Sequence, residues 1–200
     1  MLAVKEEAVS YQDVLDAPEG MRAEILDGEF VLQARPMPGH DFTQGGMMSV
    51  LHPAFQRGIG GPGGWWIISE PELHFGDRDH RTLVPDLAGW RRERMPVIDP
   101  AARYPVVPDW VCEILSPSTA RTDRMLKMRI YADVGVRHLW IADPATRTLE
   151  TYTLRDGHWT LLATHGDEGA VDAVPFAEVP LPLDALWLPV PEEPEQGAGI

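Results

Sequence analysis

The chain has 200 residues, of which 44% are hydrophobic and 24% charged, and its formal net charge at pH 7 is -14. This length and apolar content can supply one buried core, so we expect a single domain over residues 1–188 and exclude a disordered protein. Residues 189–200 are mainly Pro, Glu and Gly, so we expect a disordered C-terminal tail there.

The single cysteine and the lack of long apolar stretches narrow the protein class. Cys112 lies in an apolar run, where a thiol behaves as a small hydrophobic group, and a disulfide framework is excluded. The N-terminal sequence MLAVKEEAVS has no apolar segment typical of a secretion signal. No stretch approaches the roughly 18 to 20 apolar residues needed to cross a bilayer. We therefore expect a cytoplasmic protein with no membrane association.

The acidic net charge argues against unassisted binding to nucleic acid, because affinity for phosphate backbones comes mainly from cationic side chains. The charge is unevenly distributed along the chain. Residues 91–137 carry nine basic and six acidic side chains, a local charge of +3, which leaves -17 for the rest. This asymmetry indicates either a face directed at a polyanion or an ordinary solvated face.

The first part of the chain predicts a capped helix, a hairpin and a longer helix. Ser10 and Asp13 are typical of the start of a short helix that ends before Pro18. Asp27-Gly28 is a preferred two-residue turn, and it lies between the predicted strands 23–26 and 29–32. Residues 40–57 have helical apolar spacing, with a kink at Pro53. The following GIGGPGG lacks the Lys-Ser/Thr of a phosphate-binding loop and indicates a connector.

The remainder predicts strands around one helix. Apolar and β-branched runs bounded by turn residues indicate strands at 65–69, 72–75, 83–90, 110–115, 138–142, 149–154 and 159–163. Ser116 to Thr119 offer N-cap residues for a helix over Arg121–Val134, which Gly135 would end. This order of elements predicts an α/β or α+β domain with a mixed sheet and no internal repeat.

Two acidic residues interrupt apolar strands. Asp86 lies in VPDLAGW and Glu113 in WVCEIL. A buried carboxylate without a partner costs several kcal/mol, so each needs a cation, a strong hydrogen bond or a place at a strand end. Two carboxylates with bound waters also suit Mg²⁺. A hydrogen-bonded structural pair of acids is the alternative.

One face of the predicted helix carries polar residues at helical spacing. Lys127 and Tyr131 are four residues apart, and Asp123 lies one turn before Lys127. Because the helix begins shortly after the Glu113 strand, its inner face can turn back over the end of that strand. A surface Asp-Lys pair is the alternative.

The combination of AEILDGEF, His40, VPDLAGW and PDWVCEILSPSTARTDRMLKMRIYADVGVRHLWIADPATRTLETYTL resembles the Uma2 family of endonucleases within the PD-(D/E)XK nuclease superfamily. The resemblance extends from Tyr11 to Leu154. Its specificity rests on the EILSPST, K-x-x-x-Y, GV-x-x-x-W and D-P elements taken together.

The resemblance implies a restriction-endonuclease-like core, with a mixed sheet flanked by helices, that cleaves DNA with Mg²⁺ or Mn²⁺. Asp86, Glu113 and the backbone carbonyl of Ile114 would bind the metal, and Lys127 would orient the attacking water and offset charge in the transition state. The superfamily usually has lysine two residues after this glutamate. Here that position is Leu115, so the resemblance implies that the lysine has moved to the helix.

Further site residues follow from the same resemblance. Glu24 would bind metal through water or a second ion, and His40, Glu70 and Tyr131 would support the site. A helix cap for His40 and a strand-end acid for Glu70 are equally open. Arg121 and Arg124 are candidates for DNA contacts. A homodimer or a basic partner would help to offset the negative charge.

Three other functions can be weighed. A catalytically silent relative that binds nucleic acid or protein would be expected to lack Asp86 or Glu113, and both are present. A serine hydrolase using Ser116 or Ser118 is disfavoured because neither lies in a G-x-S-x-G motif. A zinc enzyme is disfavoured because the seven histidines form no H-E-x-x-H or Cys/His cluster.

Overall fold

The computed structural model describes residues 8–33, 37–100, 104, 106–166 and 169–189. Its centre is a six-stranded mixed sheet in which β7 and β8 run parallel and all other neighbours run antiparallel. In spatial order the strands are β10 (His158–His165), β9 (Thr148–Arg155), β8 (His138–Asp143), β7 (Trp110–Ile114), β6 (Leu87–Arg91) and β3 (Trp65–Ser69).

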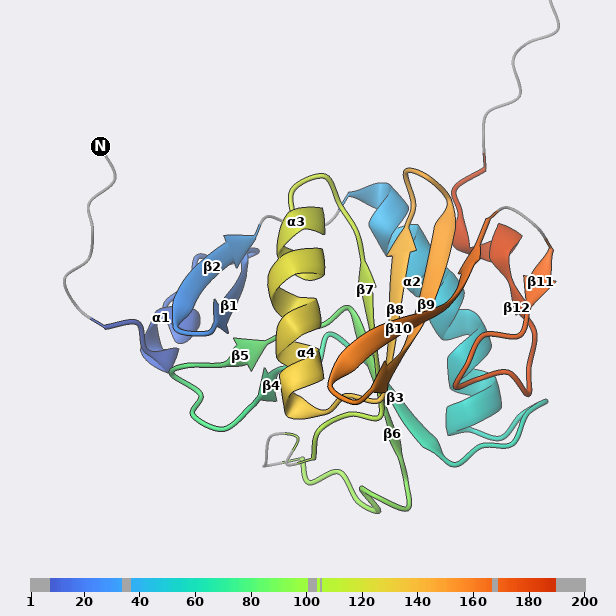
Figure 1. Ribbon diagram of the computed structural model, residues 1–200, viewed down its shortest axis with the longest axis horizontal. Helices are drawn as coiled ribbons and strands as arrows, with labels where there is room; N and C mark the ends of the chain where they lie inside the picture. Colours follow the sequence, from blue (N-terminus) through green and yellow to red (C-terminus); the bar gives the residue numbers. More distant parts are fainter. Residues whose placement is uncertain (1–7, 34–36, 101–103, 105, 167–168, 190–200) are drawn as a thin grey trace, which may run out of the picture.

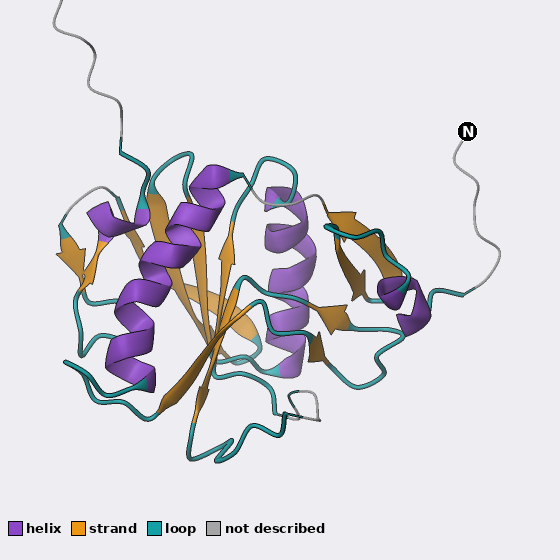
Figure 2. Ribbon diagram, turned by 180° about the vertical axis from the view of Figure 1, so that it is seen from behind, coloured by secondary structure: helices purple, strands orange, loops and turns teal. Residues whose placement is uncertain are grey.

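Two helices cover opposite faces of this sheet (Figures 1 and 2). One is α2 (Pro38–Leu51), which continues into the π-helical segment η1 (His52–Gln56). The other connects β7 to β8 and comprises α3 (Ala120–Thr122), the π-helical η2 (Asp123–Lys127) and α4 (Met128–Val134). It ends at Gly135, whose φ of 83° provides the left-handed cap predicted from the sequence.

The alternation of side chains along β7 builds a core on each face. Trp110, Cys112 and Ile114 pack in the core that contains α2. Val111 packs in the second core, with residues of α4. Because successive side chains of a strand point to opposite faces, Glu113 must lie on the α4 side. The register of β7 therefore determines which helix meets this acid.

A second sheet of four strands lies on the other side of the α3–α4 helix (Figure 1). Its order is β2 (Glu29–Gln33), β1 (Arg22–Leu26), β5 (Thr82–Leu83) and β4 (Leu73–His74), and α1 (Tyr11–Leu15) precedes it in the chain. The predicted hairpin is present, with positive φ angles of 52° at Asp27 and 83° at Gly28. The prediction of an α+β fold with a mixed sheet, an N-terminal helix and a hairpin is confirmed.

One predicted strand is wrong in a way that matters for the site. Residues 83–90 do not form one strand, because β5 ends at Leu83 and β6 begins at Leu87 in the other sheet. Pro85 has no N–H to donate to a ladder, so the chain leaves one sheet here and enters the next. Asp86 therefore lies in the link between the two sheets and not within a strand.

The C-terminal part adds elements that the sequence did not predict. β11 (Ala170–Val171) and β12 (Leu181–Pro182) pair with each other, and the 3₁₀ helix η3 (Leu183–Leu186) follows. η3 packs on α2, where the hydroxyl of Thr43 donates a 2.6 Å hydrogen bond to the carbonyl of Leu186. Of the tail predicted over 189–200, all but residue 189 lies outside the described residues.

Candidate active site

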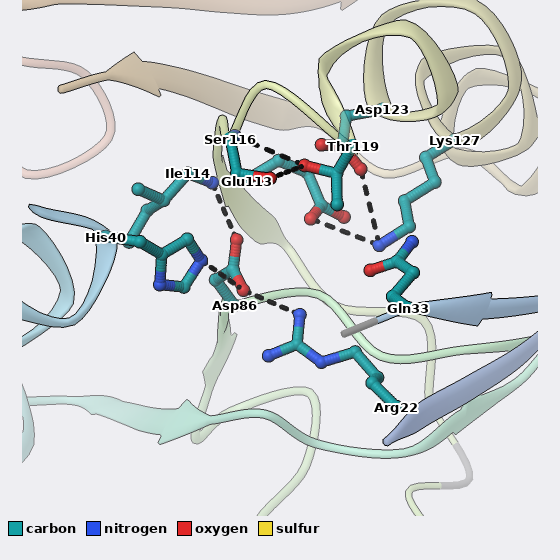
Figure 3. Close-up of a pocket in the computed structure, with 10 residues that line it drawn as sticks. All are labelled: Arg22, Gln33, His40, Asp86, Glu113, Ile114, Ser116, Thr119, Asp123 and Lys127. Carbon is teal, nitrogen blue, oxygen red and sulfur yellow. Dashed lines mark hydrogen bonds and ion pairs between the residues drawn. The ribbon is translucent and has the colours of Figure 1, made fainter. Parts of the chain in front are cut away.

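A small polar cavity lies where the two sheets and the two helices meet (Figure 3). Its volume of about 20 Å³ is enough for one water molecule or a small cation. The residues around it come from β1, β2, α2, the β5–β6 link, β7, the turn after β7 and the α3–η2 helix. They are Arg22, Gln33, His40, Asp86, Glu113, Ile114, Ser116, Thr119, Asp123 and Lys127.

Asp86 is buried and held on several sides. Its Oδ2 accepts a 2.7 Å hydrogen bond from the backbone N–H of Ile114, which replaces a ladder bond at the point where β6 and β7 diverge. Its Oδ1 lies 2.8 Å from Nη1 of Arg22 and 3.0 Å from Nε2 of His40. The carboxylate is thus fixed in orientation at the edge of the cavity.

These partners keep Asp86 ionised. Burial by itself would raise the pKa of this carboxyl group. The hydrogen bond and charge of His40, together with the charges of Arg22 and Lys127, outweigh burial and lower the pKa to about 2. A charged hard oxygen ligand is therefore available over the whole physiological pH range.

Glu113 faces the same cavity from β7. Its Oε1 accepts a 2.5 Å hydrogen bond from the hydroxyl of Tyr131, and its Oε2 lies 3.3 Å from Nζ of Lys127. Burial raises the pKa of Glu113 well above its usual value. The charge of Lys127 opposes this shift, whereas the neighbouring carboxylates of Asp123, Asp86 and Glu24 add to it. The raised pKa favours the protonated form of Glu113, and an added cation would favour its ionised form.

Lys127 is the cation at the centre of these acids. Its Nζ lies 3.0 Å from Oε1 of Glu24, 3.3 Å from Oε2 of Glu113 and 3.6 Å from Oδ1 of Asp123, with 1% of its side chain exposed. Burial lowers its pKa, but the charges of these acids dominate and raise it above the ordinary value. The ammonium is thus permanently charged. It is carried by the π-helical η2, a type of segment that is frequent at functional sites.

The chemistry of the donor set suits a hard divalent cation. Three acidic side chains line the cavity, from Asp86, Glu113 and Asp123, and a fourth, Glu24, lies behind Lys127. They face two permanent cations, Lys127 and Arg22. A divalent ion would offset this excess negative charge. Among the described residues, however, no group of three or more His, Cys, Asp or Glu is already arranged to hold a metal. Asp86 and Glu113 would have to share or exchange their present partners.

The other predicted site residues lie at different distances from the cavity. His40 lines the cavity and bonds Asp86. Tyr131 lies behind Glu113, and Glu24 behind Lys127, where it also accepts from the N–H of Val84 at 2.7 Å. Glu70 follows β3 with a φ of 49° and pairs with Arg22, so the interpretation as an acid at a strand end fits its place.

The predicted DNA contacts are not part of the cavity lining. Arg121 is exposed in α3, and Arg124 forms a 2.7 Å ion pair with Glu150 of β9. The described basic residues of the segment 91–137 also do not all lie near the cavity. Arg92 donates to backbone carbonyls of Gln56 and Trp65, and Arg94 pairs with Asp109, at the end of β6 remote from Asp86. This distribution favours the interpretation as a solvated surface.

Three residues that the sequence analysis did not select contribute to the site. Arg22 bridges Asp86 and Glu70, Gln44 donates a 2.9 Å hydrogen bond to the carbonyl of Asp86, and Gln33 donates to Glu24. Periodic spacing could have found two of these three residues, Arg22 and Gln44. Arg22 is two residues before Glu24 on a strand, and Gln44 is four residues after His40 on a helix, so each shares a face with a selected residue.

Three comparisons with known proteins complete these observations. A crystal structure of a putative nuclease belonging to DUF820 from Anabaena variabilis ATCC 29413 has a similar fold, with a TM-score of 0.65 and 23% sequence identity over 89% of this chain and 97% of that chain. A search of the curated proteins found no match. Within the described part of the chain, no helix is both long and apolar enough to cross a membrane.

The third comparison is with protein families. The family model described as "Uma2: Putative restriction endonuclease" matches residues 9–184, which include every residue of the cavity. The match covers most of the chain and agrees with the motifs identified in the sequence. The chain belongs to the Uma2 family of restriction-endonuclease-like proteins.

Proposed function

We propose that the protein is a metal-dependent endonuclease that hydrolyses DNA phosphodiester bonds at the Asp86–Glu113–Lys127 cavity. The observation that carries the proposal is the convergence of two carboxylates and one permanently charged ammonium, from three separate elements, on one small cavity. Family membership supports nuclease chemistry in general. The cytoplasm remains the expected location.

Each side chain has a distinct part in the proposed reaction. Asp86, Glu113 and the carbonyl of Ile114 would hold Mg²⁺ or Mn²⁺, which would lower the pKa of a bound water and polarise the phosphate. Lys127 would orient the attacking water and offset charge that develops on the phosphate oxygens. Tyr131, by its hydrogen bond to Glu113, and His40, by its contact with Asp86, would fix the two carboxylates before DNA binds.

Cleavage of plasmid and single-stranded DNA tests this proposal. Activity in Mg²⁺ or Mn²⁺ should fall at least about 100-fold in Asp86→Asn and in Lys127→Ala, because each removes a charge at the cavity. Asp109→Asn is a matched control, since Asp109 is equally buried but lies at the opposite end of β7. Equal activity in the parent and both cavity variants would indicate a contaminating nuclease and refute the proposal.

A catalytically silent relative that binds nucleic acid or protein is the second candidate. It is favoured by one observation: Asp86 and Glu113 are already engaged by Arg22, His40, Lys127 and Tyr131. Calorimetric titration with Mn²⁺ separates the two candidates. The nuclease should bind Mn²⁺, and Asp86→Asn should abolish binding, whereas a silent relative with a structural acid pair should give no heat of binding in either protein.

A further inference from the structure

A second hollow adjoins the catalytic cavity and differs from it in chemistry. It has a volume of about 280 Å³ and shares two residues with the cavity, His40 and Ser116. Figure 3 shows both residues around Asp86, with His40 beside it and Ser116 above it near Thr119. His40 comes from α2 and Ser116 from the turn after β7. The cavity and the hollow are therefore direct neighbours, separated by no more than these two side chains.

The wall of the hollow is formed mainly by apolar groups from three separate segments. These are the start of α2, the turn that follows β7 and the turn between β8 and β9. The apolar members are Met37, Leu115, Pro117, Pro144 and Ala145. Met37 is 60% exposed, so part of this wall is left open to solvent. Such a surface suits a flat ring and offers little to a phosphate group.

A nucleic-acid strand alternates charged phosphates with flat bases, and this alternation matches a charged cavity that lies beside an apolar hollow. Each phosphate is followed by a sugar that carries a base, so a phosphate that contacts a metal ion held by Asp86 and Glu113 would place a neighbouring base beside the cavity. A base inside a duplex is stacked and paired, and it can enter a side pocket only after it leaves the stack. A base in a single strand is free to do so.

The charge of the protein points in the same direction. With a net charge of -14, the chain repels any polyanion. A single strand carries less charge per unit length than a duplex, and its binding is correspondingly less dependent on neutralised phosphates. The acidic protein therefore meets a smaller electrostatic penalty with an unpaired strand.

We infer that the hollow lined by Met37, Leu115 and Pro144 binds the unpaired base next to the scissile phosphate, so that the substrate is single-stranded or locally unpaired DNA. This inference rests on the proposed function for its substrate, but it concerns a different surface. Base binding on apolar side chains tolerates any sequence, because every base has a flat apolar face. The protein should accordingly discriminate the presence of a base rather than its identity.

Three oligonucleotides with one backbone sequence test the inference: a single strand, the same strand with abasic positions, and the duplex. Their affinity for the full chain is measured by fluorescence anisotropy with Mn²⁺, and cleavage is followed in parallel. The single strand should bind about tenfold more tightly than the abasic strand. Ala145→Trp, which fills the hollow from an exposed turn residue, should remove that difference. Thr146→Trp on the same turn lies outside the lining and should preserve it.

The outcomes separate this inference from the proposed function. Cleavage without discrimination against the abasic strand, or tighter binding of the duplex, would overturn the base-binding hollow and leave the nuclease proposal intact. Discrimination without cleavage would support the hollow and refute the nuclease proposal. If the protein neither binds nor cleaves any of the three, both are wrong.

Discussion

Lys127 is a buried ammonium that compensates three acids, and its removal tests how strongly the site depends on it. In Lys127→Met the carboxylates of Glu24, Glu113 and Asp123 would lose their common partner. Breaking a buried ion pair from one side costs about 3 to 5 kcal/mol, so we expect a loss of this size in the free energy of unfolding. Urea unfolding followed by tryptophan fluorescence measures it.

A double variant supplies the control for this prediction. Adding Glu113→Gln to Lys127→Met removes one of the stranded charges and should recover part of the lost stability. A loss below about 1 kcal/mol in Lys127→Met would contradict the prediction. It would mean that water already solvates the three acids in the folded protein.

The raised pKa of Glu113 predicts a pH dependence of stability in metal-free protein. Burial and the neighbouring carboxylates favour the protonated form in the folded state, so the folded protein binds more protons than the unfolded chain above the ordinary value of 4.5. The contribution of Glu113 is fully present below pH 4.5 and is lost as pH rises through the folded pKa.

Glu113→Gln should therefore remove a fall in stability as pH rises above about 4.5. The hydrogen bond from Tyr131 can be retained in this variant, because the amide oxygen still accepts. Urea midpoints of the parent and the variant, measured in chelator from pH 4.5 to 9, provide the comparison. Parallel curves for the two proteins over this range would show that Glu113 titrates normally.

The sequence predicted two acids of the candidate site but not all of the side chains that hold them. Asp86 and Glu113 stood out because an acid within an apolar run needs a partner, and the structure places both at the cavity. Arg22 did not stand out, since an arginine at the start of a strand is usually solvated. Its role depends on Asp86, which is 64 residues away in the chain. Such a partnership cannot be inferred from local periodicity.

At the scale of elements, the sequence predicted a helix, strand or turn correctly where the backbone preferences of adjacent residues determine it. Asp27-Gly28 predicted the hairpin because both residues accept positive φ. The break in the predicted strand 83–90 was missed, although Pro85 marked it, because apolar residues continue on both sides. Two short strands in different sheets have the same sequence pattern as one long strand. Only the pairing partners distinguish them, and these are distant in sequence.

The packing of α2 against η3 allows a matched test of two adjacent glycines. A Cβ on Gly46 would overlap the backbone carbonyl oxygen of Ala185, whereas one on Gly45 would meet nothing within 4 Å. Gly46→Ala should lower the free energy of unfolding by about 1 to 3 kcal/mol through overpacking. Gly45→Ala should raise it by about 0.5 to 1 kcal/mol, because alanine loses less entropy in a helix.

This pair also tests whether the position of α2 matters for the site. α2 carries His40 and Gln44, which both contact Asp86. Displacement of the helix in Gly46→Ala should therefore weaken Mn²⁺ binding, while Gly45→Ala should leave it unchanged. Equal unfolding midpoints for the two variants would show that η3 can move away from a Cβ on Gly46 without loss of stability. The close packing of α2 and η3 would then not contribute to the stability of the protein.

At the scale of the whole molecule, the fold explains how side chains as far apart in sequence as Arg22 and Lys127 line one cavity. The chain leaves the four-stranded sheet at Leu83, places Asp86 at the junction and enters the six-stranded sheet at Leu87. The β7–β8 crossover then brings Lys127 back over the end of β7. The hairpin and the long helices were predictable from local sequence, but the junction between the two sheets was not, because it depends on which strands pair.

The distribution of cations over the whole molecule predicts a weak dependence of DNA binding on salt. Among the described arginines, Arg22 is held by Asp86 and Glu70 and Arg124 by Glu150, so few are left to meet a phosphate, with Arg121 exposed in α3. For single strands, the slope of log K against log salt is about -0.7 for each neutralised phosphate. One or two such contacts give a slope between about -0.7 and -1.4.

Anisotropy titrations of single-stranded DNA at constant free Mn²⁺, over a range of monovalent salt, measure this slope. A shallow slope would show that the metal and the apolar hollow, rather than a basic surface, provide most of the affinity. A slope steeper than about -5 would contradict this, because it requires seven or more phosphate contacts that one protomer does not offer near its cavity. Sedimentation in the presence of DNA would then be expected to reveal a dimer that joins the cations of two copies.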